Sequence, residues 1–199
     1  CGRCVKECPY GAIVKKQRPC AAACGIIVPE TQLMPSKRCS GYFAVRRFDR
    51  DGSVRRHMLT AAAILEADWR TASMDYHTLM KLTRILSRSN DADTEQMFRR
   101  MCFNVFAHNR DDHAKNFTWI YDNSQDCWHP SPAYDLTWST TYFGEHTTTV
   151  NGNGKEPSQQ DLLAVGKTAG IPLRTCKQIA EEIWERTRII EHKYHAMRS

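Results

Sequence analysis

The sequence lacks any run of about 18 consecutive apolar residues, the length that a membrane-spanning helix needs. It also lacks a charged-then-apolar leader, so we expect a cytoplasmic protein rather than a secreted one. Glycine and proline are scarce, with 10 and 8 residues, which excludes collagen-like chains and wholesale disorder. Hydrophobic residues make up 41% and charged residues 25% of the 199, as in a globular chain with one domain and a short appendage.

Histidine is absent from the first 40 residues, so this head cannot form a mixed Cys/His zinc site from its own side chains. The same head holds six of the nine cysteines and seven Lys or Arg against two Glu. Residues 41–199 carry 21 basic against 20 acidic side chains, so the net charge of +6 belongs mostly to the head. A near-neutral remainder without a basic, aromatic-rich helix predicts no direct binding of nucleic acid.

The head carries a closely spaced cysteine motif. Two cysteines three positions apart are followed by a Cys-Pro and by a further pair, namely Cys1, Cys4, Cys8, Cys20 and Cys24. Residues 1–26 resemble a truncated ferredoxin-type segment of iron-only hydrogenases, which implies a 4Fe-4S cluster held by these thiolates. The alignment puts one cysteine of the run ahead of Cys1, so we expect the natural chain to start upstream. A zinc site of four cysteines is the alternative, whereas disulfides are disfavoured without a secretory signal.

Residues 27–40 are a mostly polar connector, and residues 41–199 have the pattern of a mainly helical α+β lobe. We expect first a strand at 42–45 and a turn at Asp51-Gly52. Three helices follow: one at 58–68, a second that starts at Asp75 and a third that starts at Asp93. After them we expect a hairpin over 117–128, a helix from Ser158 to about 169 and a long helix from Thr175. Met97, Met101 and Val105 recur every four residues in the third helix, and this stripe predicts core packing rather than a cofactor site.

The polar stretch between the third helix and the hairpin carries the candidate chemistry. Asp111 and Asn116 have the spacing of a protein-kinase catalytic loop, in which Asp accepts the hydroxyl proton and Asn holds Mg²⁺. Asp135 follows the hairpin, where a kinase places a second metal-binding carboxylate, and such hard oxygen ligands suit Mg²⁺. Each piece alone also fits a solvated loop, and a metallohydrolase set lacks a third histidine at ligand spacing. The order of helix, Asp-x₄-Asn, hairpin and Asp favours the kinase.

Four segments, 47–50, 108–117, 131–135 and 151–154, resemble the C-terminal region of HipA-family toxins, the serine/threonine kinases of toxin–antitoxin systems. The resemblance runs from about residue 29 to the end and implies transfer of phosphate from Mg-ATP to a protein Ser or Thr. It also implies a role for each matching residue: Asp111 as catalytic base, Asn116 and Asp135 as Mg²⁺ ligands, His113 and Lys115 as loop supports, and Phe48 and Asp49 as the hinge that contacts adenine and ribose. The family often has an acidic residue at the position of Arg46.

Neither a glycine-rich phosphate loop nor a Val-Ala-Ile-Lys strand precedes Phe48, so the resemblance covers a C-lobe alone. We therefore expect weak nucleotide binding and little or no phosphate transfer without an N-lobe. The alternatives are an inactive lobe that binds an antitoxin or a separate N-lobe polypeptide, and a redox protein that works through the cysteine head. A fourth hypothesis is that recombination or sequence assembly joined head and lobe without a shared function.

Overall fold

The structure is a computed structural model that describes residues 18–37, 42–68, 74–139 and 144–195. The predicted ligands Cys1, Cys4 and Cys8 lie outside these residues. The described helices are α2 (Arg18–Ala23), α3 (Ala61–Ile64), α4 (Tyr76–Leu86), α5 (Asp91–Phe106), the 3₁₀ turn η2 (Ala114–Asn116), α6 (Gln159–Thr168) and α7 (Leu173–His195). The described strands are β1 (Thr31–Met34), β2 (Tyr42–Val45), β3 (Arg50–Asp51), β4 (Val54–Arg55), β5 (Met58–Thr60), β6 (Met74–Asp75), β7 (Thr118–Asp122), β8 (Cys127–Pro130) and β9 (Thr148–Thr149).

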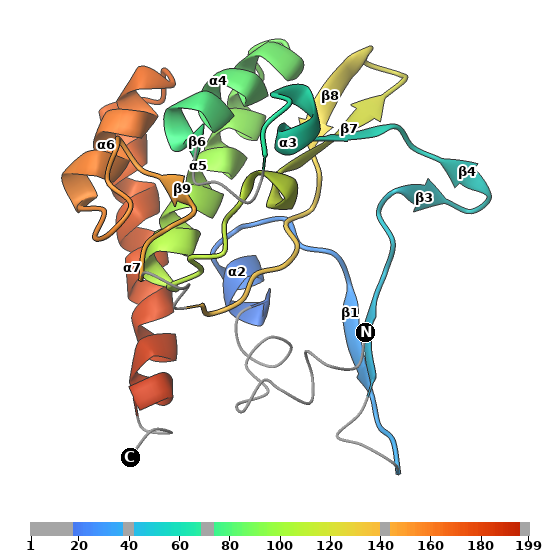
Figure 1. The fold of residues 1–199 in the computed structure, drawn as a ribbon, viewed down its shortest axis with the longest axis horizontal. Coiled ribbons are helices and arrows are strands. Elements are labelled where there is room, and N and C mark those ends of the chain that lie inside the picture. The colour runs from blue at the N-terminus through green and yellow to red at the C-terminus, as the bar shows by residue number, and fades with distance from the viewer. Residues whose placement is uncertain (1–17, 38–41, 69–73, 140–143, 196–199) are drawn as a thin grey trace.

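Helix α5 forms the centre of the core. It packs against both α4 and α7, and α6 packs against α7, so the four helices gather on one side of the molecule (Figure 1). Met97, Met101 and Phe98 on α5 are fully buried, as are Leu79 on α4 and Ile183 on α7. The predicted core stripe of the third helix is therefore confirmed, because apolar residues at a period near 3.6 share the face that turns away from water.

The helix starts follow from side chains that accept the first free backbone N–H groups. The side chain of Asp75 accepts a hydrogen bond from the His77 backbone N–H at 2.8 Å, which confirms the predicted start of α4. The next helix begins earlier than expected, because Asn90 rather than Asp93 is its N-cap. Asp91 and Asp93 instead lie in the first turn of α5, where negative charge is favoured by the helix dipole.

The predicted helix over 58–68 is wrong at both ends. Met58–Thr60 form β5, which pairs antiparallel with β7, and only Ala61–Ile64 are helical. The cross-strand hydrogen bonds to β7 satisfy the backbone of 58–60, and these non-local partners override the local helical pattern. The sheet continues from β7 to β8, as the predicted hairpin requires.

Helix α6 approaches its neighbours closely at a glycine. A Cβ on Gly166 would lie 2.5 Å from Cys176 Sγ on α7 and 2.6 Å from Phe98 Cε2 on α5. Only glycine therefore fits at this position of α6 without a shift of its neighbours. The helix starts as predicted at Ser158, which forms a capping box with Asp161.

Helix α2 and the residues after it pack into the lobe rather than standing apart from it. Ala21, Cys24 and Ile26 are buried in the core, and Arg99 on α5 donates to the Cys24 carbonyl at 2.9 Å. The packing thus reaches back before residue 41, the predicted start of the lobe, because apolar side chains in the second half of the head cover α5 and α7. In contrast, the ribbon of β1 and β2 extends away from the helices (Figure 1).

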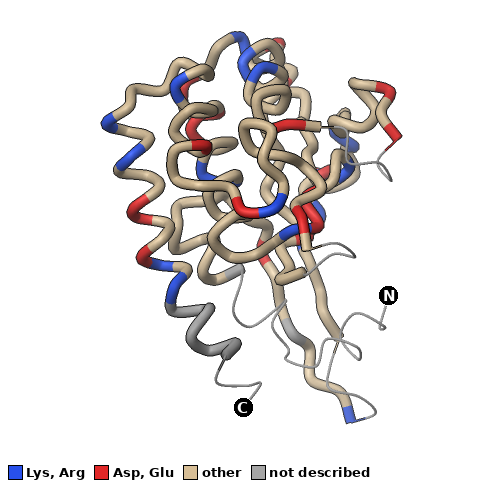
Figure 2. The backbone as a smooth tube through the Cα atoms, turned by 60° about the vertical axis from the view of Figure 1, so that its left-hand side comes forward, with Lys and Arg blue, Asp and Glu red and all other residues tan. Residues whose placement is uncertain are grey.

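Acidic and basic positions are interspersed over the described chain (Figure 2). This pattern agrees with the near balance of charge over 41–199. Among the residues that the structure describes, no helix combines the length and the apolar character that crossing a membrane requires.

Candidate functional site

The candidate loop leaves the end of α5 and is held there by asparagine side chains. Asn109 is buried, its backbone N–H donates to the Asn104 carbonyl at 2.8 Å, and its Nδ2 donates to Asn104 Oδ1 at 2.9 Å. The backbone of His108 is left-handed, with φ of 52°, which turns the chain out of the helix. These contacts fix where the loop begins relative to α5.

Asp112 anchors the middle of the loop. Its carboxylate is fully buried and accepts hydrogen bonds from Tyr76 Oη at 3.0 Å, His146 Nδ1 at 3.0 Å and the Thr148 backbone N–H at 3.1 Å. Tyr76 Oη also accepts from Asn104 Nδ2 at 2.9 Å, so the loop anchor is continuous with α4 and α5. Burial, together with the nearby Asp112 carboxylate, raises the pKa of Tyr76 well above its ordinary value.

Asp111, the predicted catalytic base, lies beside this anchor but faces outward. Its side chain is 50% exposed, and its Oδ1 lies 3.8 Å from His113 Nε2. Asn116 Nδ2 donates to the Asp111 backbone carbonyl at 2.8 Å, so the two residues of the Asp-x₄-Asn motif contact each other directly. The amide of Asn116 thereby points its nitrogen at the loop, which leaves Oδ1 on the opposite side of the group.

Tyr134 joins the loop to the segment after the hairpin. Its hydroxyl donates to the Lys115 carbonyl at 2.5 Å and lies 2.5 Å from Thr118 Oγ1. Asp135 comes next in the chain, is exposed, and has a left-handed backbone with φ of 52°. Burial raises the pKa of the Tyr134 phenol, so it stays a neutral donor over the ordinary pH range.

The predicted hinge contacts the same tyrosine. The ring of Phe48 stacks on Tyr134 with centroids 5.7 Å apart and an angle of 28°. Asp49 forms a two-bond ion pair with Arg47, and the Arg47 hydrogen bonds hold the pKa of the Asp49 carboxyl below its usual value. A chain of contacts thus runs from the hinge through Tyr134 to Lys115, next to Asn116.

Arg100 secures the backbone ahead of Tyr134. This arginine of α5 is buried and donates to the Ser131 carbonyl, while the Ser131 backbone N–H donates to the Thr118 carbonyl at 2.8 Å. Burial lowers the pKa of Arg100 to about 10, which still leaves the guanidinium charged near neutral pH. No sequence pattern indicates this anchor, because an arginine in an amphipathic helix usually faces solvent.

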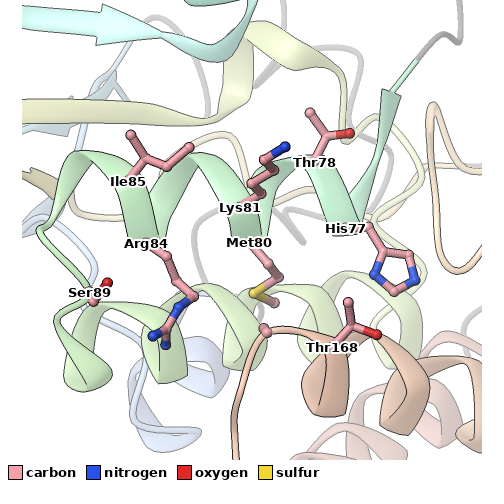
Figure 3. A pocket seen from close by; sticks show the side chains of 9 residues that line it. His77, Thr78, Met80, Lys81, Arg84, Ile85, Ser89 and Thr168 are labelled. Atoms are coloured by element: carbon pink, nitrogen blue, oxygen red, sulfur yellow. The ribbon is translucent and has the colours of Figure 1, made fainter.

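Cavities lie near the hinge and on α4. One of about 380 Å³ is lined by Phe48, with Arg46 and Arg47 beside it. Another of about 550 Å³ lies where α4 faces the end of α6, and Met80 points from α4 toward Thr168 there (Figure 3).

Cys20 and Cys24 are the two predicted cluster ligands that the structure describes. Cys24 is fully buried and hydrogen-bonds to Cys20, which lowers the pKa of the Cys20 thiol and, together with burial, raises that of Cys24. Cys20 Sγ also contacts the Arg186 carbonyl at 3.5 Å. The described residues include no group of three or more His, Cys, Asp or Glu placed to hold a metal ion. The iron–sulfur cluster stays a prediction.

A family model then decides the relationship. The model for the HipA-like C-terminal domain matches residues 19–189. The chain belongs to this family. The match starts within the segment 1–26 that resembles a ferredoxin and includes Cys20 and Cys24, in agreement with their packing against the HipA-like domain.

Two relatives extend this result. The Sinorhizobium fredii (strain NBRC 101917 / NGR234) protein named "Putative kinase Y4dM" is 27% identical over 186 residues, which cover 83% of this chain and 44% of the relative. HipA from Shewanella oneidensis MR-1, solved with HipB and operator DNA, has the same fold with a TM-score of 0.66 at 18% identity, covering 86% of this chain and 46% of that one. The HipA-like chain therefore spans less than half the length of either relative.

Sequence reasoning missed the residues that hold the loop of this HipA-like domain in place. No sequence pattern singled out Asp112, Tyr76, Asn104 or His146. Tyr76 and His146 lie 36 and 34 positions from Asp112, so no local spacing reveals these two contacts.

Proposed function

We propose that this chain is the C-terminal lobe of a HipA-like serine/threonine kinase, which transfers phosphate from Mg-ATP to a hydroxyl of a protein. The observation that carries the proposal is the hydrogen bond from Tyr134 to the Lys115 carbonyl, which ties the segment before Asp135 to the loop of Asp111 and Asn116. Family membership and the relative named as a kinase support it. In phosphoryl transfer most of the catalysis comes from positioning and electrostatics, so a rigidly held loop matters.

Each loop residue has a role that suits its surroundings. The half-exposed carboxylate of Asp111 accepts the proton of the attacking hydroxyl, and His113 at 3.8 Å helps to orient it. Asn116 Oδ1 and the exposed carboxylate of Asp135 are hard oxygen donors that fit Mg²⁺. When bound, the ion neutralises charge on the transferred phosphate. Lys115 supports the loop through its backbone carbonyl.

The hinge is the proposed nucleotide contact. Phe48 lines the cavity of about 380 Å³ and offers an aromatic surface for adenine, and Asp49 offers a carboxylate for the ribose hydroxyls. Stacking on Tyr134 couples the position of Phe48 to the segment before Asp135.

Metal-dependent nucleotide binding tests the proposal in the chain as it stands. Mn²⁺ replaces Mg²⁺, and the electron paramagnetic resonance signal of free Mn²⁺ is measured as ATP and protein are added. We expect the ternary complex to weaken by about tenfold in Asp135→Asn and in Asn116→Ala, because each removes a ligand. Asp91→Asn is the control, since it removes the same charge from a side chain that is 90% exposed on α5.

Phosphate transfer from γ-labelled Mg-ATP to a generic Ser/Thr acceptor such as casein is the second measurement, made at high protein concentration and long incubation so that the low rate expected of a lobe without its N-lobe rises above the rate without protein. Asp111→Asn should lower transfer by about 100-fold or more while the Mn²⁺-ATP complex is unchanged, since a general base contributes at the proton-transfer step. Equal transfer by wild type and variant would remove Asp111 from its role, and nucleotide binding without metal dependence would contradict the kinase proposal.

A partner-binding role without catalysis is the second candidate. The ribbon of β1 and β2 exposes Met34 and Tyr42 at 43% and 54%, and Ile27 ahead of it at 57%. We propose that a separate N-lobe polypeptide covers this ribbon, and that an antitoxin is a further partner, as HipB is in the complex of the Shewanella protein. Stable association with such a partner in the absence of any Mn²⁺-ATP complex would favour this candidate.

A further inference from the structure

A cysteine, a histidine and an aspartate line up at the junction of β8 and α5. Cys127 Sγ lies 3.4 Å from His129 Nε2, and His129 Nδ1 lies 2.6 Å from Asp93 Oδ2. Cys127 and His129 are two positions apart on β8 and therefore share one face of the strand. Asp93 comes from the first turn of α5, 36 positions earlier.

This arrangement places an imidazole between a thiol and a carboxylate. A nucleophile whose proton can pass to a base, with the base oriented by a third group, is the general pattern of an activated cysteine. The two ring nitrogens of His129 point to opposite sides, so the three side chains cannot bind one metal ion together. The geometry therefore suits proton transfer rather than metal binding.

The surroundings limit which molecules can react at this site. His129 lines a cavity of about 560 Å³ together with Tyr121 and Asp122 of β7, while Cys127 is only 6% exposed. A reactant must therefore be small. The charged and titratable groups that interact with the trio are Tyr121, Asp122 and, from α5, Arg100.

We propose that Cys127 is a nucleophilic thiol that reacts with small hydroperoxides, with His129 as its base and Asp93 as the positioning residue. The Cys127 proton passes to His129 Nε2, and the sulfur attacks one peroxide oxygen. The S–O bond forms as the O–O bond breaks, and the departing hydroxide takes the proton back from the imidazolium. Cys127 is oxidised to the sulfenic acid, and hydrogen peroxide is reduced to water.

Other thiols of the lobe provide an internal comparison. Cys102 and Cys176 are fully buried, and burial raises the pKa of both thiols. Buried thiols of this kind are inert. The site is independent of the proposed kinase function, because none of its three residues belongs to the loop, the hinge or the segment at Asp135.

Alkylation of the folded chain by iodoacetamide measures the reactivity of each cysteine. Trypsin releases Cys127 in the peptide 116–155 and Cys102 in the peptide 101–110, each as the single cysteine, so mass spectrometry separates the two rates. At pH 7 we expect Cys127 to react at least about tenfold faster than Cys102. Equal rates would overturn the proposal.

Variants of the trio separate proton transfer from folding. His129→Gln should slow alkylation of Cys127 by about tenfold at pH 7, and Asp93→Asn should slow it by about threefold or more. At pH 10 an ordinary thiol ionises without a base, so both variants should then match wild type. A defect that persists at pH 10 would indicate a structural role and overturn the proposal, as would an unchanged rate at pH 7. His77→Gln on α4 is the matched control and should leave the rate unchanged.

Oxidation tests the hydroperoxide itself. Hydrogen peroxide with dimedone, which traps sulfenic acid, should label the peptide 116–155 in wild type and about tenfold less in His129→Gln at pH 7. Absence of the dimedone adduct in wild type would overturn the assignment of hydroperoxides as the reactant.

Discussion

Replacing Asp112 by alanine should destabilise the lobe far more than replacing its neighbour Asp111. The Asp112 carboxylate is fully buried and accepts from Tyr76 Oη, His146 Nδ1 and the Thr148 backbone N–H. A buried donor left without an acceptor costs about 1–3 kcal/mol, and removing one partner of a buried pair costs about 3–5 kcal/mol. These losses overlap, so we expect Asp112→Ala to lower the free energy of unfolding by about 3–5 kcal/mol.

The adjacent residue provides the control. The Asp111 side chain is 50% exposed and 3.8 Å from its histidine neighbour, so Asp111→Ala should change the free energy of unfolding by less than about 0.5 kcal/mol. Urea unfolding followed by tryptophan fluorescence and far-ultraviolet circular dichroism measures both variants at one pH. Asp112→Asn keeps one acceptor oxygen and should cost about 1–3 kcal/mol, which preserves the measurement if the alanine variant does not fold.

A double-mutant cycle then isolates one contact. Tyr76→Phe removes the hydroxyl that donates to Asp112 at 3.0 Å, and the coupling between the two changes should be about 0.5–3 kcal/mol. If Asp112→Ala costs less than about 1 kcal/mol, or if Asp111→Ala costs as much, the buried anchor does not hold the loop and the argument from burial is refuted.

Two further predictions concern α6. Gly166→Ala should lower the free energy of unfolding by about 1–3 kcal/mol, because the added Cβ would lie 2.5 Å from Cys176 Sγ. This cost outweighs the helix propensity of alanine, which favours the helix by about 1 kcal/mol over glycine. An unchanged or higher Tm would contradict the prediction. The pKa of Asp161 is lowered to about 2 by hydrogen bonds, first from Asn151 and then from Ser158. The ionised Asp161 carboxyl therefore stabilises the folded state above its unfolded pKa of about 3.9, and this stabilisation is lost as the pH falls toward 2. Asp161→Asn should cost about 0.5–1 kcal/mol at pH 7, since solvent screens this surface group, and should flatten the loss of stability below pH 4 in urea titrations; an unaltered acid limb would contradict the assignment.

The sequence predicted the elements that local chemistry specifies. The cap at Asp75, the helix start at Ser158 and the four-residue stripe of Met97 and Met101 all depend on neighbours within one or two helical turns. The prediction failed at Met58–Thr60, where pairing with β7 supplies the hydrogen bonds. It also missed Asn90 as the N-cap of α5, because Asp93 is an equally good capping type.

The sequence by itself determined the composition and spacing of the candidate loop and its resemblance to HipA, which the family match over residues 19–189 confirms. Only the tertiary structure decided that Asp112 is buried and Asp111 half exposed, because the donors that surround Asp112 come from α4 and from the segment around β9. The tertiary structure likewise places Asp93 beside His129. The two residues are 36 positions apart, so the sequence does not indicate that they are within hydrogen-bond distance.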